Sequence, residues 1–392
     1  MSPMRFVSLL FCVLVACGRA ASPDAATVPD APSEDRVGVA SITPAPEPPP
    51  EKPSTKLVAD EDVGPLLAKL SETPGDFPSE NYVSNELSLL DVAPALRDPK
   101  LRGRAYVGVG PDQNFTYLAM LEPSVAYVVD IRRGNFLEHM FFRGCFEAGE
   151  TRAAFLRALV ARKPDALAAD APFATLADAF RAAPADVALR DEGVARTKAL
   201  LDRLHVVRER GDDASITRIH GAFAKHGLSI AYTMTNSGRT YPTLAEILSI
   251  RDSATGSASF LDSEERYRAV RRLVVENRVL PVVGDFGGVH ALKAVGDDMR
   301  ARKLSLGVFY TSNVEQYLFD GRKYAAFVGS VGAMPHDETS RIVRVWFDQG
   351  RPHPAQGKHR TTQLTIPVDV FLDRATHKPF KSYWEVATQT AP

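Results

Sequence analysis

The sequence predicts a doubly wound α/β fold that has a mostly parallel sheet and a helical insertion. Short apolar runs alternate with helical patterns from about residue 104 onward. The run 125–131 (VAYVVDI) is almost continuously apolar, which is typical of a strand buried on both faces of a parallel sheet. The order strand, helix, strand across residues 105–131 fits a right-handed βαβ unit.

The N-terminus has the pattern of an export signal. Arg5 gives a short positive region, and residues 6–15 form an apolar stretch too short to span a bilayer as a helix. The stretch Leu14-Val15-Ala16-Cys17 follows, and it resembles the lipobox of bacterial lipoproteins, in which the cysteine carries the lipid. An ordinary signal peptide and a buried strand are the alternatives. We expect a lipoprotein signal peptide at residues 1–16 and an acylated Cys17 as the link to a membrane.

The next segment, residues 17–57, is rich in Ala and Pro and lacks aromatic residues. It has little apolar surface to bury, so we expect a disordered tether. The folded domain should then cover residues 58–392, with the helical insertion at about 150–275. Cys145 would be the one cysteine left after Cys12 and Cys17, and its apolar neighbours favour a buried small hydrophobe over a nucleophile.

The elements of the domain are read from hydrophobic periodicity and capping residues. The expected helices are 62–71, 84–96 (with Ser84 as a possible cap), 112–121 (with Asp112 as a possible cap), 135–161, 173–183, 193–204, 263–277, 287–303 and 313–319. The expected strands are 105–110, 125–131, 279–286, 304–312 and 340–347.

Composition narrows the classes of partner. The 392 residues are 45% hydrophobic and 24% charged, with a formal net charge of -1. There is no basic excess to neutralise phosphates, so nucleic acid is not expected as a partner. The spacings typical of zinc sites, of a P-loop and of a GxSxG nucleophile are absent from the sequence, and we expect no metal.

The residues after the first and second strands point to a small ligand. Gly108 and Gly110 let the backbone turn tightly and approach a ligand, and the next helix offers free N–H groups. Asp130 ends the second strand twenty residues after Gly110, where a carboxylate can accept hydrogen bonds from ribose hydroxyls. The alternative is a tight strand–helix turn, with Asp130 capping the next helix or pairing with Arg132 or Arg133.

Further polar residues follow other expected strands. Parallel strands place their carboxyl ends at one edge, so we expect these clusters to converge on one crevice. The expected cofactor-binding residues are Gly108, Gly110, Asp112, Asn114 and Asp130, the substrate-binding residues are Asn85, Glu86, Asn313 and Glu315, and the catalytic candidates are Asp285 and Tyr310. Asp285 could instead cap the next helix, Glu315 could complete a capping box with Ser312, and Tyr310 could belong to the core.

The glycine pattern resembles motif I of class I S-adenosylmethionine methyltransferases. Tyr106 and Asp112 stand where that family usually has an acid and a third glycine, whereas Asp130 matches its ribose ligand. The stretches NYVSNE, YVGVGPDQNFTYLAMLEPSVAYVVDIRR, VLPVVGDFGG and VFYTSNVEQYLF together resemble an uncharacterised family of bacterial proteins over about residues 78–350. This resemblance implies a Rossmann-like (methyltransferase-like) fold, and it makes S-adenosylmethionine the candidate cofactor.

Two hypotheses for function follow. The export signal and the altered positions Tyr106 and Asp112 favour an envelope-anchored lipoprotein that binds a small nucleotide-like ligand at the GVG loop, residues 108–110. The alternative is an active S-adenosylmethionine-dependent methyltransferase. By resemblance to lipoprotein sorting rules, Gly18 after the cysteine favours the periplasmic side of the outer membrane, if the host has one.

Overall fold

The computed structural model describes residues 56–168, 170–233 and 239–389. All of them belong to the second of two units into which the chain divides, residues 53–392. The signal peptide, Cys17 and almost all of the tether lie outside the described residues. Within the described ranges, no helix is both long and apolar enough to cross a bilayer.

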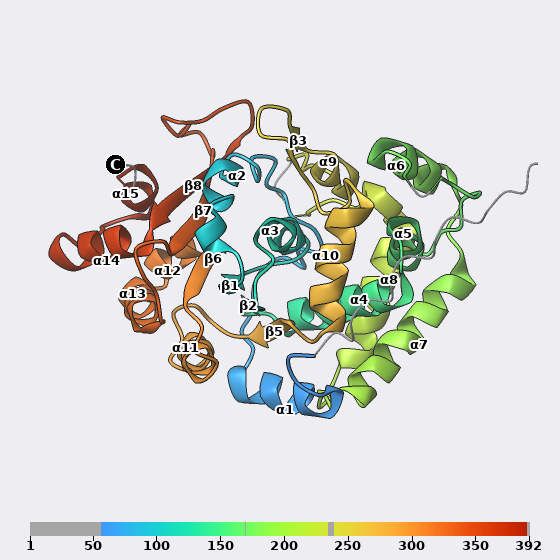
Figure 1. Cartoon of the computed structure of the whole chain (residues 1–392), viewed down its shortest axis with the longest axis horizontal. Coiled ribbons are helices and arrows are strands. Elements are labelled where there is room, and N and C mark those ends of the chain that lie inside the picture. Colours follow the sequence, from blue (N-terminus) through green and yellow to red (C-terminus); the bar gives the residue numbers. More distant parts are fainter. Residues whose placement is uncertain (1–55, 169, 234–238, 390–392) are drawn as a thin grey trace, which may run out of the picture. The chain divides into compact units, whose positions relative to one another are not determined.

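A six-stranded sheet forms the centre of the unit (Figure 1). Its strands are β1 (Ala105–Gly108), β2 (Val125–Asp130), β5 (Val279–Val283), β6 (Leu306–Ser312), β7 (Arg341–Phe347) and β8 (Thr361–Pro367), in the order β5-β2-β1-β6-β7-β8. The first five in this order are parallel, and β8 pairs antiparallel with β7. The doubly wound α/β prediction is therefore confirmed.

The strand order decides where a ligand can approach. β1 is followed in sequence by β2 on one side, and the chain later returns to the other side of β1 as β6. Such a reversal opens a crevice at the carboxyl ends of the two strands, and open α/β sheets bind ligands there. The loops after β1 and β6 are therefore the first places to look for a site.

Helices flank the sheet on two sides (Figure 1). One group includes α3 (Gln113–Leu121), α4 (Arg133–Ala148) and α10 (Glu264–Val275), which contact one another through α10. The other includes α11 (Ala291–Ala301), α13 (Tyr324–Ala333) and α14 (Val368–His377), which contact one another through α13. The remaining helices around the sheet are α1 (Asp60–Leu70), α2 (Ala93–Leu96), the 3-10 turn Pro99–Leu101, α12 (Val314–Asp320) and α15 (Tyr383–Thr388).

The segment between β2 and β5 carries the helical insertion. Beyond α4 it contains α5 (Arg152–Val160), α6 (Phe173–Ala182), α7 (Val187–Arg203), α8 (Asp212–His226), the 3-10 turn Gly227–Ser229, α9 (Leu244–Leu248) and the small hairpin of β3 (Arg251–Asp252) and β4 (Ser257–Ala258). Cys145 is free and fully buried, as expected of a small core residue.

Two expected helices were wrong in extent. The stretch 84–96 forms turns up to residue 92, and only Ala93–Leu96 is helical. Ser84 therefore caps no long helix, because its hydroxyl binds Gln113 instead. The expected helix 135–161 breaks between α4 and α5, where the Thr151 side chain accepts a hydrogen bond from the Ala154 N–H and starts a new helix. Strand β8 and the helices α13, α14 and α15 were not expected.

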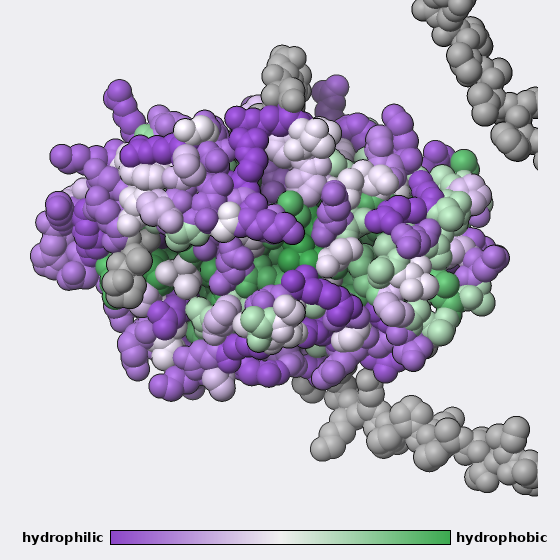
Figure 2. All heavy atoms as spheres, turned by 90° about the horizontal axis from the view of Figure 1, so that it is seen from above, coloured by the Kyte–Doolittle hydropathy of each residue, from purple (hydrophilic) through white to green (hydrophobic). Residues whose placement is uncertain are grey.

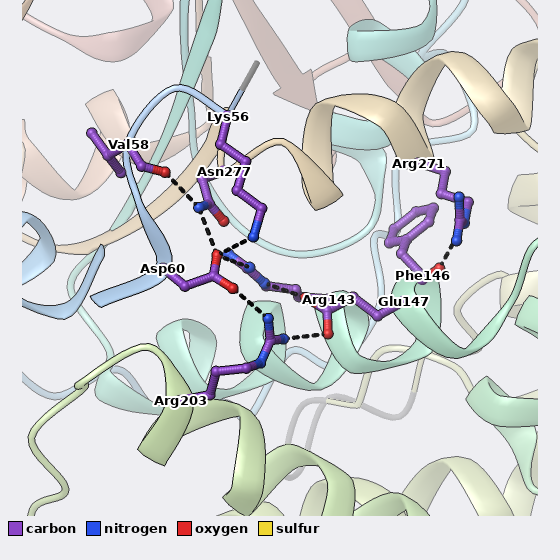
Figure 3. Close-up of polar contacts among 9 residues, drawn as sticks. All are labelled: Lys56, Val58, Asp60, Arg143, Phe146, Glu147, Arg203, Arg271 and Asn277. Atoms are coloured by element: carbon purple, nitrogen blue, oxygen red, sulfur yellow. Dashed lines mark hydrogen bonds and ion pairs between the residues drawn. The ribbon is translucent and has the colours of Figure 1, made fainter. Parts of the chain in front are cut away.

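An ion-pair network marks the start of the described domain (Figure 3). Asp60 Oδ1 accepts hydrogen bonds from Lys56 Nζ at 2.7 Å and Asn277 Nδ2 at 3.0 Å, and its Oδ2 accepts one from Arg203 Nη1 at 2.6 Å. Arg203 Nη2 also pairs with Glu147 Oε2 at 2.5 Å. These contacts fasten α1 to α4, α7 and the start of β5, close to where the tether was expected to end.

Apolar surface gathers in a recessed band between polar rims on one face of the molecule (Figure 2). In Figure 1 this face carries α2 and α9, where a second, small apolar cluster lies apart from the main core. The cluster consists of Leu89, Leu90 and Ile247, with Leu87, Met120 and Ile250 packed against it. It holds the turns after residue 86 against α3 and α9.

Candidate functional site at the carboxyl ends of the central strands

The two glycines at the end of β1 and in the loop after it have different roles. A Cβ on Gly108 would lie 2.1 Å from Asn114 Oδ1 and 2.7 Å from the Tyr106 hydroxyl, so this glycine is needed for packing within the chain. Gly110 has a φ of +75°, which favours glycine, and a Cβ there would meet nothing within 4 Å. Only Gly110 therefore leaves space beside the loop.

Asn114, which we expected to bind the cofactor, forms hydrogen bonds that hold the loop. Its Nδ2 donates to the backbone oxygens of Val109, Gly110 and Pro111 at 2.8–3.0 Å. Its Oδ1 accepts a hydrogen bond from the Tyr106 hydroxyl at 2.8 Å. Tyr106 lies at the position where the class I methyltransferases usually have an acid. Through Asn114, its buried hydroxyl helps to hold the loop.

Asp112 lies at the N-terminus of α3, but its carboxylate does not cap that helix. Oδ1 accepts a hydrogen bond from the backbone N–H of Ser84 at 2.7 Å, and Oδ2 has no hydrogen-bond partner among the described residues. The side chain is buried, and burial raises the pKa of Asp112 to about 6. The expected cap is therefore replaced by a link to the segment before β1.

Asp130 ends β2 as expected, and its carboxylate is paired. Arg132 donates from Nε and Nη2 to the two carboxylate oxygens at 3.0 Å each, and its backbone N–H donates to Oδ1 at 2.9 Å. Arg132 Nη1 binds the carbonyl oxygens of Ser79 and Glu80. Of the two alternatives to a ribose contact, pairing with Arg132 is the one present.

Glu86 links the start of α3, the end of β6 and strand β8. Its oxygens accept hydrogen bonds from Gln113 Nε2 at 2.8 Å, from the Ser312 hydroxyl and from Gln363 Nε2. The side chain is buried, and desolvation raises its pKa despite these donors. The crevice at the reversal of strand order is therefore filled by the chain's own polar groups.

The turn after β6 completes this arrangement. Ser312, which donates to Glu86, has a φ of +49°, an uncommon conformation for a residue other than glycine. Tyr310, a catalytic candidate, is buried with its ring edge-on to Tyr117 at 5.2 Å between centroids. Burial raises the pKa of Tyr310 well above its usual value. Asn85 and Asn313 are half-buried beside these groups in sequence.

Glu315 lies on the same turn, but its side chain belongs to a buried ion pair. Arg344 Nε donates to Glu315 Oε1 at 2.8 Å, and both side chains are fully buried. The hydroxyls of Thr311 and Tyr324 donate to the two carboxylate oxygens at 3.1 Å. These contacts saturate Glu315 and fasten α12 to β7.

Asp285 lies just after β5, which is separated from β6 in the sheet by the two strands β2 and β1. It accepts hydrogen bonds from the Gly287 N–H at 2.8 Å and from Lys323 Nζ at 2.6 Å. Glu72, not Asp285, accepts from the backbone N–H groups of His290 and Ala291 at the start of α11. The structure therefore brings Glu86, Ser312 and the GVG loop together but leaves Asp285 and Glu315 with separate partners.

Sequence reasoning missed a polar group on α4. Asn135 and Glu138 are each 1% exposed, and neither side chain has a hydrogen-bond partner among the described residues. His139, next to Glu138, contacts the Gly110 carbonyl oxygen through Nε2 at 2.9 Å. The available signal was the stretch NFLEHMFF, in which the polar residues Asn135, Glu138 and His139 interrupt an otherwise apolar helix.

A groove of about 410 Å³ opens at the end of β5. Its walls include Leu67, Glu72, Arg133, Phe136, Val207 and Val283. Arg133 is already paired with Asp212 at 2.8 Å, and its guanidinium lies over the Phe136 ring. In the described ranges, no group of three or more His, Cys, Asp and Glu side chains is arranged to hold a metal ion.

Comparison with known proteins identifies the family. A search of curated proteins finds no significant match. The model of a domain of unknown function, DUF7790, matches residues 81–389, which include every strand of the central sheet and the polar groups around Glu86 and Gly110. The chain therefore belongs to the DUF7790 family.

Proposed function

We propose that this protein is an envelope-anchored lipoprotein whose α/β domain binds a small nucleotide-like ligand at the GVG loop. Two independent parts of the chain carry the proposal. The N-terminal sequence supports the anchor, and the loop after β1 supports the ligand site. No catalytic step is needed for this function.

The observation that carries ligand binding is the geometry of Gly110. This residue lies two positions after the end of β1, in the loop at the reversal of strand order. It adopts a left-handed conformation, and the space that a Cβ would fill is free. Its neighbour Asp112 keeps one buried carboxylate oxygen without a partner among the described residues. A backbone with open space beside a hydrogen-bond acceptor suits a ligand that carries hydroxyl or amino groups.

The anchor rests on the sequence around Cys17. A short positive region, an apolar stretch and a small residue before the cysteine occur in the order that lipoprotein signals require. A single acylated cysteine followed by a Pro- and Ala-rich segment would hold the domain near a membrane without a spanning helix. We place the domain on the periplasmic side of the outer membrane if the host has one.

A second candidate is an active S-adenosylmethionine-dependent methyltransferase. Asp130 at the end of β2 favours it, because a carboxylate there can accept hydrogen bonds from ribose hydroxyls. In that case the ligand would share Asp130 with Arg132, and an acceptor would have to displace the groups around Glu86. The filling of the crevice by Glu86, Gln113 and Ser312 favours the binding protein.

Calorimetric titration of the full chain in detergent with S-adenosylmethionine and S-adenosylhomocysteine separates these functions. Binding that is lost in Asp112→Asn and Gly110→Val, but kept in the surface variant Asp297→Asn, supports a ligand site at the loop. Methyl transfer to any acceptor in a cell extract would favour the enzyme. If no nucleoside-bearing probe binds to folded protein, the ligand part of the proposal fails.

Membrane attachment is tested separately. Cys17→Ser should abolish incorporation of labelled palmitate and release the chain from the membrane fraction. The matched control is Cys12→Ser, which leaves the proposed acylation site in place. Attachment that persists in Cys17→Ser would contradict the lipoprotein assignment.

A further inference from the structure

The α4 side of the GVG loop holds buried polar atoms that the described residues do not satisfy. Both carboxylate oxygens of Glu138, both polar atoms of the Asn135 amide and Oδ2 of Asp112 have no hydrogen-bond partner among the described residues. All three side chains are at most 4% exposed. Buried polar groups are nearly always paired, so such a concentration calls for a group that the chain does not itself supply.

These atoms belong to one neighbourhood. Asn135 and Glu138 are three residues apart on α4 and therefore lie on the same side of the helix. Glu138 interacts electrostatically with both Asp112 and Arg132, and also with the Tyr82 phenol. The next residue, His139, contacts the carbonyl oxygen of Gly110. The group thus lies between α4, the GVG loop and the segment before β1.

The local charge is not balanced. Asp112 and Glu138 are both acids, and burial raises the pKa of each. Arg132 is the positive group that attracts Glu138, but its guanidinium is already bound to Asp130 and to the backbone oxygens of Ser79 and Glu80. A buried carboxylate without a paired cation is costly, and a cation with several N–H donors would compensate it.

We propose that Glu138, with Asn135 and Asp112, receives a protonated amine of the ligand bound at the GVG loop. This inference rests on the proposed function and specifies the ligand class as a small nucleoside-like molecule with an alkylammonium group. An ammonium offers three donors, which suit the carboxylate oxygens of Glu138 and Asp112 and the Asn135 Oδ1. Water would supply donors but no charge.

A metal ion fits this position less well. Hard divalent cations take six or more oxygen ligands, usually with several carboxylates. The described residues include no convergent group of three or more potential metal-binding side chains. An ammonium needs fewer converging ligands and is therefore the better match.

The test compares two probes that differ in one group, adenosine and 5′-amino-5′-deoxyadenosine, by calorimetric titration of the full chain in detergent at pH 7. A charged hydrogen bond in a buried site should make the amine bind about tenfold tighter or more. Glu138→Gln should reduce that preference to about twofold or less, because it removes the charge and keeps the shape. Glu192→Gln, an exposed acid of α7, is the matched control and should keep the full preference.

The outcomes separate the two proposals. Equal binding of both probes would overturn the amine site and leave the nucleotide-like ligand in place. A preference for the amine that survives in Glu138→Gln would overturn the assignment to Glu138. If neither probe binds to protein that melts cooperatively by circular dichroism, the proposed function fails and the amine site fails with it.

Discussion

The two sides of the GVG loop differ in how completely the chain satisfies its own buried polar groups. On the β6 side, Glu86 accepts hydrogen bonds from Gln113, Ser312 and Gln363. On the α4 side, Asn135 and Glu138 have no partner among the described residues. The first side forms a structural support, and the second is the side at which we propose that the amine of a ligand binds. A carboxylate at a strand end therefore indicates a ligand site only when its partners within the protein are known.

The largest expected effect is a loss of stability on the β6 side, where the buried polar groups have partners. Arg344→Leu would leave Glu315 as a buried, unpaired carboxylate beside β7. Breaking a buried ion pair by removing one partner costs about 3–5 kcal/mol, so we expect the free energy of unfolding in urea to fall by about that amount.

The double variant Arg344→Leu/Glu315→Leu provides the control. Replacing both partners with apolar groups should recover most of the lost stability. If Arg344→Leu alone unfolds at the wild-type urea midpoint, Glu315 is not held by this pair.

The next effect distinguishes the two glycines of the loop. Gly108→Ala would force a Cβ against Asn114 and Tyr106, and overpacking of this kind costs about 1–3 kcal/mol. Gly221→Ala is the matched control, because Gly221 lies within helix α8 with free space around it. That control should instead gain about 0.5–1 kcal/mol in thermal or urea unfolding. A neutral Gly108→Ala would mean that the loop is not packed as described.

A smaller effect, an increase in the free energy of unfolding, is expected for a substitution of Glu138 on the α4 side of the GVG loop. Desolvation raises the pKa of Glu138, so the folded state is favoured at low pH and loses stability as pH rises from 4.5 through the raised value. Glu138→Gln should remove this loss and stabilise the ligand-free protein at pH 7 by about 1 kcal/mol. Urea unfolding from pH 4 to 8 measures both quantities, with Glu192→Gln as control. Destabilisation at pH 7 would indicate that Glu138 has a partner in the folded protein.

The smallest effect is expected where charges are near solvent. Burial acts to raise the pKa of Asp60, but hydrogen bonds from Lys56 and Asn277 outweigh it and lower the pKa to about 2. Asp60 therefore contributes stability above pH 3.8, which is lost as pH falls towards 2. Asp60→Asn should cost less than about 1 kcal/mol at pH 7 in physiological salt, because exposed pairs are screened. Acid unfolding of both proteins tests this, and coincident curves across that range would contradict it.

Most of the fold could be predicted from the sequence, and the elements that were predicted wrongly have physical causes. The apolar runs of β2 and β6 identified buried strands, and Asp130 was correctly placed at a strand end. The stretch 84–96 has helical periodicity, yet Ser84 and Glu86 bond to groups far away in sequence, and these bonds hold the segment in turns. Tertiary hydrogen bonds thus overrode local propensity.

The sequence by itself determined the class of sheet, the glycine turn after β1 and the pattern of an export signal, because each depends on residues close together in the chain. Only the tertiary structure decided which polar side chains are already paired. Three carboxylates that the sequence predicted to bind a ligand or to act in catalysis form ion pairs within the protein. The pairs are Asp130 with Arg132, Glu315 with Arg344, and Asp285 with Lys323. Glu138 became a candidate for the opposite reason. The local sequence shows a polar residue within an apolar helix, but only the contacts between distant segments show that its carboxylate has no hydrogen-bond partner among the described residues.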